Sequence, residues 1–231
     1  MKKKRYLLGI ILLVVVMFQL PVISSEYSGS IAVEAKVKNG LVKNKNTYYY
    51  YQNGKKVKNK WIKIKNKKYY FKSNGQAATG SYKVKGVYYI FKTNGQLYTP
   101  SKKSFVTVKA KKYLVSTKGK AVSGWVSGKK YYCKKNGAMV TGIQAINNTF
   151  YAFNAKGVQN TVLTKKLQAA SNYEQDMTDL YALIGKPISS SYQAGCYLGS
   201  GKDGALTYRN FVVYTFRYDD GREIFMDVEA R

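Results

Sequence analysis

The feature that most constrains the fold is a motif that recurs about every twenty residues through the middle of the 231-residue chain. Each copy contains a cluster of aromatic or apolar residues and then a short polar turn that ends in glycine. These turn glycines are Gly54, Gly75, Gly95, Gly119, Gly137 and Gly157, so successive copies lie 21, 20, 24, 18 and 20 residues apart. A repeat of this length predicts a solenoid, in which each unit packs only against its neighbours.

Each copy is predicted to form a β-hairpin. In WIKIKNKKYYFKSNG, residues 61–65 and 68–72 have strand character and flank a polar turn at Asn66 and Lys67. The Asn-Gly pair that follows predicts a second tight turn with positive φ angles. Because a single hairpin is only marginally stable in water, we expect successive hairpins to bury their aromatic side chains against one another. This packing accounts for most of the 23 tyrosines.

The distribution of charge divides the chain into two parts. Residues 26–163 contain 28 lysines and two glutamates, a net charge of +26, whereas residues 164–231 contain eight basic and nine acidic residues, a net charge of −1. Ahead of them, a basic segment, an apolar run and small residues predict a secretory signal peptide, with an uncleaved anchor as the alternative. The expected organisation is a signal peptide over 1–25, a linker over 26–38, the repeats over 39–162 and a separate domain over 163–231.

The acidic part is predicted to be a small α+β domain that folds alone from Thr164. Residues 171–174 (SNYE) have the pattern of a capping box, and the apolar residues that follow have helical spacing up to Gly185. Three strands are expected over 192–198, 206–218 and 222–229, with a break of the second near Asn210 as the alternative and GSGKDG (199–204) as a loop. The expected fold class is therefore mainly β: a β-hairpin solenoid of about six repeats, followed by a helix on an antiparallel sheet. Cys133 and Cys196 could form one disulfide, but small apolar roles within strands are favoured.

The repeats resemble the cell-wall-binding repeats of Gram-positive surface proteins, the choline-binding and glucan-binding repeat families. The resemblance covers residues 39–160, and GWVSGKKYYCKKNGAMVTG, from Gly124 to Gly142, is the most typical unit. It implies a β-hairpin solenoid that tethers an exported protein to polymers of the cell wall. Residues 185–216 also resemble a small domain of unknown function in clostridial exported proteins, and that resemblance implies no activity.

The first resemblance also implies a cage of three aromatic residues that holds choline by cation–π attraction. One residue opens a unit, one lies seven residues before the turn glycine, and one opens the next unit. The unit that begins near Pro100 has no clear equivalent of the opening residue. Neither cage closes, because the second position is a lysine and the third is not aromatic. A lysine also repels a cation, so choline is disfavoured as the ligand. The residues at the three positions are Trp61, Lys68 and Ser81 in one cage, and Trp125, Lys130 and Ile143 in the other.

What remains is a ladder of lysines interleaved with tyrosines, in which lysine pairs at alternate positions should share one face of a strand. Ammonium groups suit phosphate, and repetition adds avidity, so the expected partner is a teichoic-acid-like polyanion or a glucan of the wall. Extracellular nucleic acid is the rival polyanion, and export disfavours it. The lysine pairs are Lys63 and Lys65, Lys83 and Lys85, and Lys109 and Lys111. The expected ligand-binding residues are Trp61, Lys68, Tyr69, Tyr82, Tyr88, Trp125, Lys130 and Tyr131. Of the two tryptophans, Trp125 is favoured as a surface on which a sugar stacks, and Trp61 is left open between that role and a place in the core.

The chain contains no histidine, which excludes Ser-His-Asp and Cys-His catalysis and histidine-based metal sites. Asp203, Asp227 and Glu229 have no turn or capping role, but nothing in the sequence pairs them as glycosidase carboxylates. We therefore expect no enzymatic activity, catalytic residue, metal or cofactor. The expected function is that of a secreted, wall-located binding protein that displays its C-terminal domain. The alternatives are a choline- or glucan-binding tether, or a protein-interaction module in which the repeats are a spacer.

Overall fold

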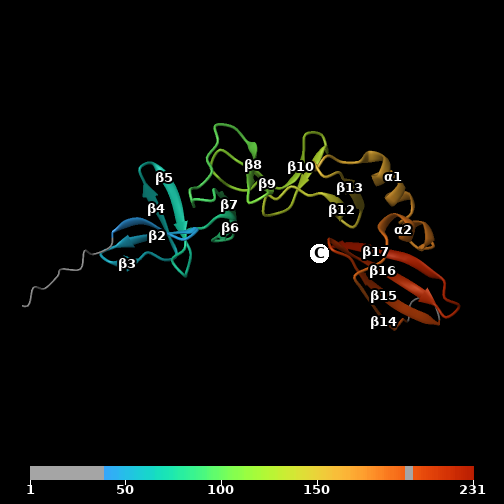
Figure 1. Cartoon of the computed structure of the whole chain (residues 1–231). Helices are drawn as coiled ribbons and strands as arrows, with labels where there is room; N and C mark the ends of the chain where they lie inside the picture. The colour runs from blue at the N-terminus through green and yellow to red at the C-terminus, as the bar shows by residue number, and fades with distance from the viewer. Residues whose placement is uncertain (1–38, 196–199) are drawn as a thin grey trace, which may run out of the picture. The chain divides into compact units, whose positions relative to one another are not determined.

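The computed structural model describes residues 39–195 and 200–231, and this part of the chain contains seventeen strands and two helices (Figure 1). The predicted signal peptide, the linker and Cys196 lie outside the described residues. The first thirteen strands form six units, each of which is a hairpin followed by a turn and an extended tail. Unit 1 contains β1 (Gly40–Asn44), β2 (Thr47–Gln52) and β3 (Lys55–Lys56). Units 2 to 6 contain β4 (Lys60–Ile64) and β5 (Lys67–Phe71), β6 (Gly80–Val84) and β7 (Val87–Phe91), β8 (Ser104–Val108) and β9 (Lys111–Val115), β10 (Gly124–Val126) and β11 (Tyr131–Cys133), and β12 (Gly142–Ala145) and β13 (Phe150–Phe153).

The hairpin turn in unit 2 lies one residue earlier than the sequence predicts. It is formed by Lys65 and Asn66, whose φ angles are +43° and +63°. Two successive positive φ angles are the mark of a turn whose twist matches that of the flanking strands. Lys85 with Gly86 and Lys109 with Ala110 form the same turn in the next two units.

The Asn-Gly turns of units 2, 3 and 5 also differ from the prediction, since only the glycine has a positive φ, whereas in unit 1 both Asn53 and Gly54 have one, at +48° and +74°. Gly75 has a φ of +78°, whereas the Asn74 side chain accepts a hydrogen bond from the backbone N–H of Gln76 at 3.0 Å. Asn94 and Asn136 accept equivalent hydrogen bonds at 3.1 Å. Asparagine therefore stabilises the turn through its side-chain oxygen rather than through its own backbone conformation.

Backbone hydrogen bonds join each unit to the one before it. The tail of unit 2 bonds to its own hairpin through Ala78 N and Tyr70 O, and to unit 1 through Ala77 N and Tyr48 O, both at 2.8 Å. The bond to the preceding unit recurs at 2.8–2.9 Å in Leu97–Lys68, Ala121–Tyr88, Met139–Lys112 and Gln159–Lys130. Because each tail closes on two hairpins, the six units form one continuous array, and the predicted hairpin solenoid is confirmed.

The close stacking of units explains why the turn residue is glycine in units 3 to 6. A Cβ atom on Gly119 would lie 2.6 Å from the carbonyl oxygen of Tyr98, whereas one on Gly86 would meet nothing within 4 Å. Both residues have a positive φ, +77° and +83° respectively. Gly86→Ala therefore carries only the cost of the backbone conformation and serves as a matched control.

We expect Gly86→Ala to lower the free energy of unfolding by about 1–2 kcal/mol, the cost of a left-handed conformation for a residue with a Cβ. Gly119→Ala should lose about 1–3 kcal/mol more, because the stacked units must separate to accept the new methyl group. Thermal and urea unfolding of the two variants measure the difference. Equal losses would show that stacking does not constrain this position.

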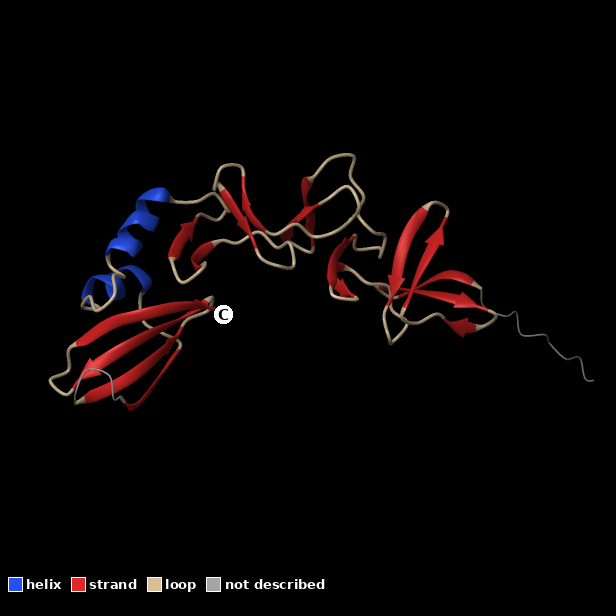
Figure 2. Ribbon diagram, turned by 180° about the vertical axis from the view of Figure 1, so that it is seen from behind, coloured by secondary structure: helices blue, strands red, loops and turns tan. Residues whose placement is uncertain are grey.

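The C-terminal domain contains α1 (Thr161–Ala169), α2 (Thr178–Ile184) and a sheet of four antiparallel strands in chain order. Figure 2 shows the two helices in blue beside this sheet. Within residues 39–195 and 200–231, neither helix is long and apolar enough to cross a membrane. The strands are β14 (Ser189–Ala194), β15 (Gly201–Thr207), β16 (Phe211–Tyr218) and β17 (Glu223–Ala230).

Several predicted details of this domain are wrong. The expected capping box starts no helix, because Glu174 has a φ of +62° and α2 begins only at Thr178, whose N–H bonds to the Asp176 carboxylate at 2.8 Å. Helix α1 was not predicted. The sheet has four strands rather than three, and most of GSGKDG belongs to β15 instead of a loop.

The last repeat and the C-terminal domain share one hydrophobic core. Phe150 of β13 packs with Leu167 of α1, Leu180 of α2 and Val213 of β16, and all four side chains are fully buried. The buried Thr164 hydroxyl accepts a hydrogen bond from the backbone N–H of Ala152 at 3.0 Å, which fixes α1 to β13. The boundary expected between residues 162 and 163 therefore falls inside α1, in a region that is continuous with unit 6.

Candidate functional site

One position in each hairpin carries the residues around which the candidate site is built. Strand pairing places the second residue of the first strand opposite an aromatic or aliphatic residue of the second strand, as in Trp61 opposite Tyr70 and Trp125 opposite Tyr132. In unit 4 this position is occupied by Phe105, opposite Leu114. Phe105 is the equivalent that the sequence comparison missed after Pro100. The residues at this position in units 2 to 6 are Trp61, Ser81, Phe105, Trp125 and Ile143.

Each tryptophan lies in a cluster of second-strand aromatics. The ring centroid of Trp61 is 5.3 Å from that of Tyr70, 5.1 Å from that of Tyr89 and 5.7 Å from that of Phe91. Trp125 has the matching contacts, at 5.2, 4.8 and 5.9 Å, with Tyr132, Tyr151 and Phe153. Two of the three partners in each cluster belong to the following unit, so both tryptophans bridge neighbouring hairpins.

The partners that the sequence assigned to these tryptophans do not complete an aromatic cage. The Ser81 hydroxyl donates a hydrogen bond to the carbonyl oxygen of Asn136 in the turn of unit 5, at 2.7 Å. Ile143 packs against the core shared with the C-terminal domain. Lys68 is exposed, and Lys130 lies over the ring of Tyr131. The missed neighbours, Tyr89 and Tyr151, are the second aromatics of their YY and FY pairs, and the alternation of strand faces is the signal that could have identified them.

Lysine ammonium groups cover the faces of several other aromatic rings. The distances from Nζ to the ring centroid lie between 4.5 and 5.7 Å, within the range of cation–π attraction. In the described part of the chain, no such contact is made to Trp61 or Trp125. The pairs are Lys56 on Tyr49, Lys72 on Tyr82, Lys83 on Tyr88, Lys92 on Tyr98, Lys112 on Phe105 and Lys130 on Tyr131.

A first groove, of about 780 Å³, lies beside Trp61. It is bounded by the hairpin of unit 2, by Tyr89 and the tail of unit 3, and by the turn of unit 4 at Thr117 and Lys118. Three successive units thus contribute to one groove. The lysines that line it are Lys63, Lys67, Lys68, Lys118 and Lys120.

A second groove, of about 820 Å³, occupies the equivalent place two units further along. It is bounded by unit 4, by Tyr131 and the tail of unit 5, and by the turn of unit 6, with Asn210 of the C-terminal domain at its edge. Its lysines are Lys111, Lys112, Lys134 and Lys156. Trp125 lines neither groove. A groove beside it would need a turn two units further on, where the chain instead forms α1.

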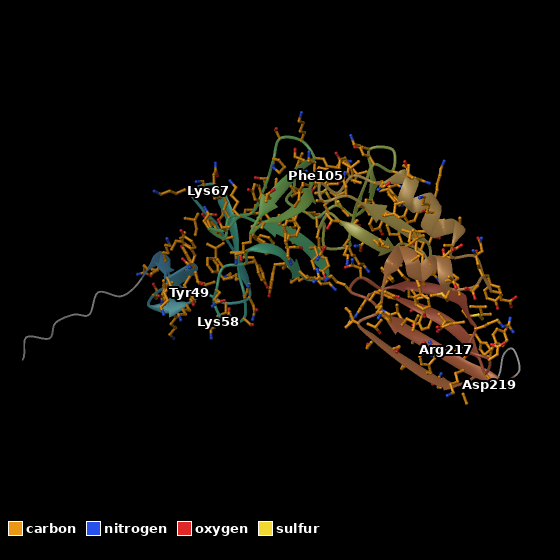
Figure 3. All side chains as sticks on the ribbon, turned by 45° about the vertical axis from the view of Figure 1, so that its right-hand side comes forward. Tyr49, Lys58, Lys67, Phe105, Arg217 and Asp219 are labelled. Atoms are coloured by element: carbon orange, nitrogen blue, oxygen red, sulfur yellow. The ribbon has the colours of Figure 1, made fainter. Side chains whose placement is uncertain are left out.

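The positive charge of the repeats has no internal counter-charge. Residues 39–162 contain 26 lysines and neither aspartate nor glutamate. In residues 39–195 and 200–231, the ion pairs are Arg217–Glu223 and Arg222–Asp220, both in the C-terminal domain. Figure 3 shows the blue nitrogen tips of the side chains around the repeat hairpins, with Lys58 and Lys67 labelled.

The predicted pairing of lysines on strand faces is wrong, because one member of each pair lies in a hairpin turn. Lys65, Lys85 and Lys109 have φ angles of +43°, +46° and +49° and stand outside the strands. The lysines gather instead at hairpin tips and in the turns after each hairpin, and these are the segments that border the grooves.

Two family models match the repeats. The model described as "Choline-binding repeat" matches residues 59–101, which include Trp61, and the model described as "Putative cell wall binding repeat" matches residues 124–139, which include Trp125. Residues 59–101 and 124–139 are therefore repeats of the cell-wall-binding family. Neither match extends into the C-terminal domain, and no match was found among curated protein sequences.

Solved structures with similar repeats come from pneumococcal proteins and a phage. CbpJ from Streptococcus pneumoniae TIGR4 is 28% identical with a TM-score of 0.39, over 53% of this chain and 42% of that protein. Choline binding protein F from Streptococcus pneumoniae is 30% identical with a TM-score of 0.38, over 54% and 42%. The cell wall endolysin from phage Cp-1, solved with choline, is 28% identical with a TM-score of 0.38, over 52% and 36%. The chain spans less than half the length of these proteins.

Seven of the eight predicted binding residues fall into three groups, and the eighth, Trp125, lines neither groove. Trp61 and Lys68 line the first groove, and Tyr131 lines the second, beneath Lys130. Tyr82 and Tyr88 are half-buried beneath Lys72 and Lys83. The structure contradicts the assignment of Tyr69 to a binding surface. Its side chain is only 6% exposed, its ring stacks on Phe71, and burial raises the pKa of its hydroxyl.

Cys133 is a free thiol in the repeat core. It lies in β11 with no exposed surface, and burial raises its pKa to about 11. A thiol in this state is neither a nucleophile nor a metal ligand at neutral pH. Across the described residues, no group of three His, Cys, Asp or Glu side chains could hold a metal ion.

The C-terminal domain contains a buried carboxylate that is fully hydrogen-bonded. Glu223 accepts hydrogen bonds from Thr215 at 2.6 Å, Tyr181 at 2.7 Å, Arg217 at 2.9 Å and Tyr192 at 3.0 Å. Burial alone would raise the pKa of Glu223, but these four donors outweigh it and hold the pKa below its usual value. Because every donor points at the carboxylate, we interpret this cluster as a stabilising network rather than as a catalytic acid.

Proposed function

We propose that the repeats hold the protein on the cell wall by binding a phosphate-bearing polymer of the teichoic-acid type at the two lysine-lined grooves. The observation that carries this proposal is the recurrence of the groove. Two grooves lie at equivalent positions, two units apart, and each combines aromatic side chains with four or five lysines and no carboxylate. We further propose that the protein is exported and that its polymer contacts are non-covalent.

The electrostatics of the repeats favour a polyanion over a neutral ligand. The lysine charges of residues 39–162 have no carboxylate within the repeats to offset their mutual repulsion. A polymer with regularly spaced phosphates would relieve this repulsion and release counter-ions as it binds. Each lysine contributes a compact point charge, and many weak contacts along one chain add up to a stable attachment.

Choline is the second candidate, and it is supported by the family match and by the two tryptophans over which no lysine lies in the described part of the chain. Against it, lysines already occupy the aromatic faces of Tyr82, Tyr88 and Tyr131. The five lysines of the first groove would repel a quaternary ammonium group placed against Trp61. The charge of the grooves therefore favours phosphate over choline as the group that is recognised.

We also propose that the C-terminal domain is a non-catalytic module that the repeats hold on the wall and that binds a protein partner. Its net charge of −1 over residues 164–231 contrasts with the basic repeats, so it is unsuited to the same polyanion. In this scheme the repeats supply the attachment and the C-terminal domain supplies the surface that is displayed.

Salt and choline distinguish the two candidate ligands. If lysine–phosphate contacts carry the binding, affinity for purified walls should fall roughly a hundredfold or more between about 50 and about 200 mM salt. Choline in the millimolar range, added at constant ionic strength, should release little protein. Sedimentation of the full chain with walls measures both effects. Release by choline together with a weak salt dependence would contradict the proposal and favour the aromatic cage.

A further inference from the structure

We propose that the first groove recognises a sugar attached to the phosphate polymer, with Trp61 as the stacking surface for the sugar ring and the groove lysines as the contacts for the neighbouring phosphate. This inference rests on the proposed function and deepens it. The ligand class is a glycosylated polyol-phosphate polymer. The second groove binds the phosphates of this polymer and makes no specific contact with the sugar.

Three aromatic neighbours hold the Trp61 ring rigidly, and part of the ring remains accessible to a ligand in the groove. Phe91 stacks against it at 5.7 Å and 29°, while Tyr70 and Tyr89 meet it edge-on at interplanar angles of 63° and 76°. Trp61 is only half-buried and lines the groove. A fixed aromatic face suits the C–H-bearing face of a pyranose, because the electron-rich face of the ring attracts weakly positive hydrogens.

The polar side chains of the first groove suit sugar hydroxyls. A hydroxyl group both donates and accepts hydrogen bonds, whereas a lysine ammonium group can only donate. The groove contains four neutral side chains that do both, beside the lysines that suit phosphate. These are Asn66, Gln96, Thr99 and Thr117.

The second groove has no free aromatic face. Its ring is Tyr131, which meets Phe105 edge-on with centroids 5.4 Å apart and has the Lys130 ammonium group 5.7 Å from its centre. A sugar stacked on Tyr131 would have to displace this lysine. We therefore assign phosphate contacts alone to this groove.

Trp125 has the same immediate packing as Trp61 but lines neither of the two grooves. Its three aromatic neighbours correspond to those of Trp61, and their centroid distances agree to within about 0.3 Å. The turn that closes the first groove comes from the unit two positions further on, and after unit 5 that place in the chain is occupied by α1. Trp125 is therefore a matched control for the structural effect of removing a tryptophan.

The experiment compares two synthetic ligands: an oligo(glycerol phosphate), and the same oligomer with one hexopyranose on each glycerol. Isothermal titration calorimetry on the full chain should show roughly tenfold tighter binding of the glycosylated oligomer. Trp61→Leu should abolish this preference, Trp61→Phe should retain part of it, and Trp125→Leu should retain all of it. Thermal unfolding of each variant confirms that the protein assayed is folded.

Each other outcome overturns the inference in a distinguishable way. Equal affinity of the native chain for both oligomers would contradict the sugar site and leave the phosphate polymer as the ligand. An equal loss of preference in Trp61→Leu and Trp125→Leu would reduce Trp61 to a structural residue. Failure of both oligomers to bind would contradict the proposed function, and the sugar site with it.

Discussion

A fragment that begins at Thr164 should be unfolded in isolation, whereas a fragment that begins at Gly142 should fold cooperatively. The first fragment lacks unit 6, and the cut falls inside α1. It therefore loses Phe150 and Ala152, which are buried against Leu167 and Val213 in the shared core. The second fragment keeps the last hairpin, both helices and the four-stranded sheet.

The expected difference between the two fragments is large on the scale of domain stability. Removal of one buried phenylalanine side chain costs about 3–5 kcal/mol, and a small domain is stable by only about 5–15 kcal/mol. The Thr164 fragment also loses the hydrogen bond between Gln168 and the Phe150 carbonyl oxygen and leaves Thr164 without its backbone partner. Circular dichroism and thermal unfolding of the two fragments test this directly. A cooperative transition in the Thr164 fragment would show that the acidic part is an independent domain.

The repeat architecture could be predicted from the sequence because the same motif of aromatic cluster and turn glycine recurs about every twenty residues. The turn glycines gave the number of units, and paired aromatics gave the second strand of each hairpin. The opening position of unit 4 was missed, because Phe105 follows a longer connection through Pro100 and its identity depends on strand register. Register is a property of paired backbones, so the sequence of one strand does not determine it.

The C-terminal domain was predicted less well because its tertiary contacts override the local signals. The stretch after Ser171 resembles a helix start, but its backbone pairs with β17, through Glu174 N to Phe225 O at 2.8 Å and Met177 N to Glu223 O at 2.9 Å. Helix α1 does have a local signal, since the Asn160 side chain caps it by accepting a hydrogen bond from Leu163 N at 3.0 Å. That signal was hidden because residue 160 also fits the tail of the last repeat.

The grooves could not be predicted, because each of them joins three units. Sequence spacing indicates which residues occupy equivalent positions, but not that the turn of unit 4 closes a groove against Trp61 of unit 2. The same spacing placed Trp61 and Trp125 at equivalent positions, and the match of its unit to the family favoured Trp125 as the surface on which a sugar stacks. The structure separates them, because the repeat array ends one unit after Trp125 and the chain continues as α1.

Groove lysines and other surface lysines should differ sharply in their effect on wall binding. Replacing Lys68, Lys118 and Lys120 with glutamine removes three charges from the first groove. Replacing Lys58, Lys102 and Lys103 removes the same net charge from exposed positions that line neither groove. The two triple variants share one net charge, so a difference between them reports binding in the groove and not general attraction.

The most direct test of the account is to measure binding of the full chain, and of these two variants, to walls before and after extraction of the phosphate polymer. We predict that extraction lowers the affinity of the native chain by roughly a hundredfold or more. On intact walls, the groove variant should lose about tenfold or more in affinity, and the control variant distinctly less. Equal binding of the native chain to intact and extracted walls would contradict the central claim that these repeats attach the protein through wall phosphate.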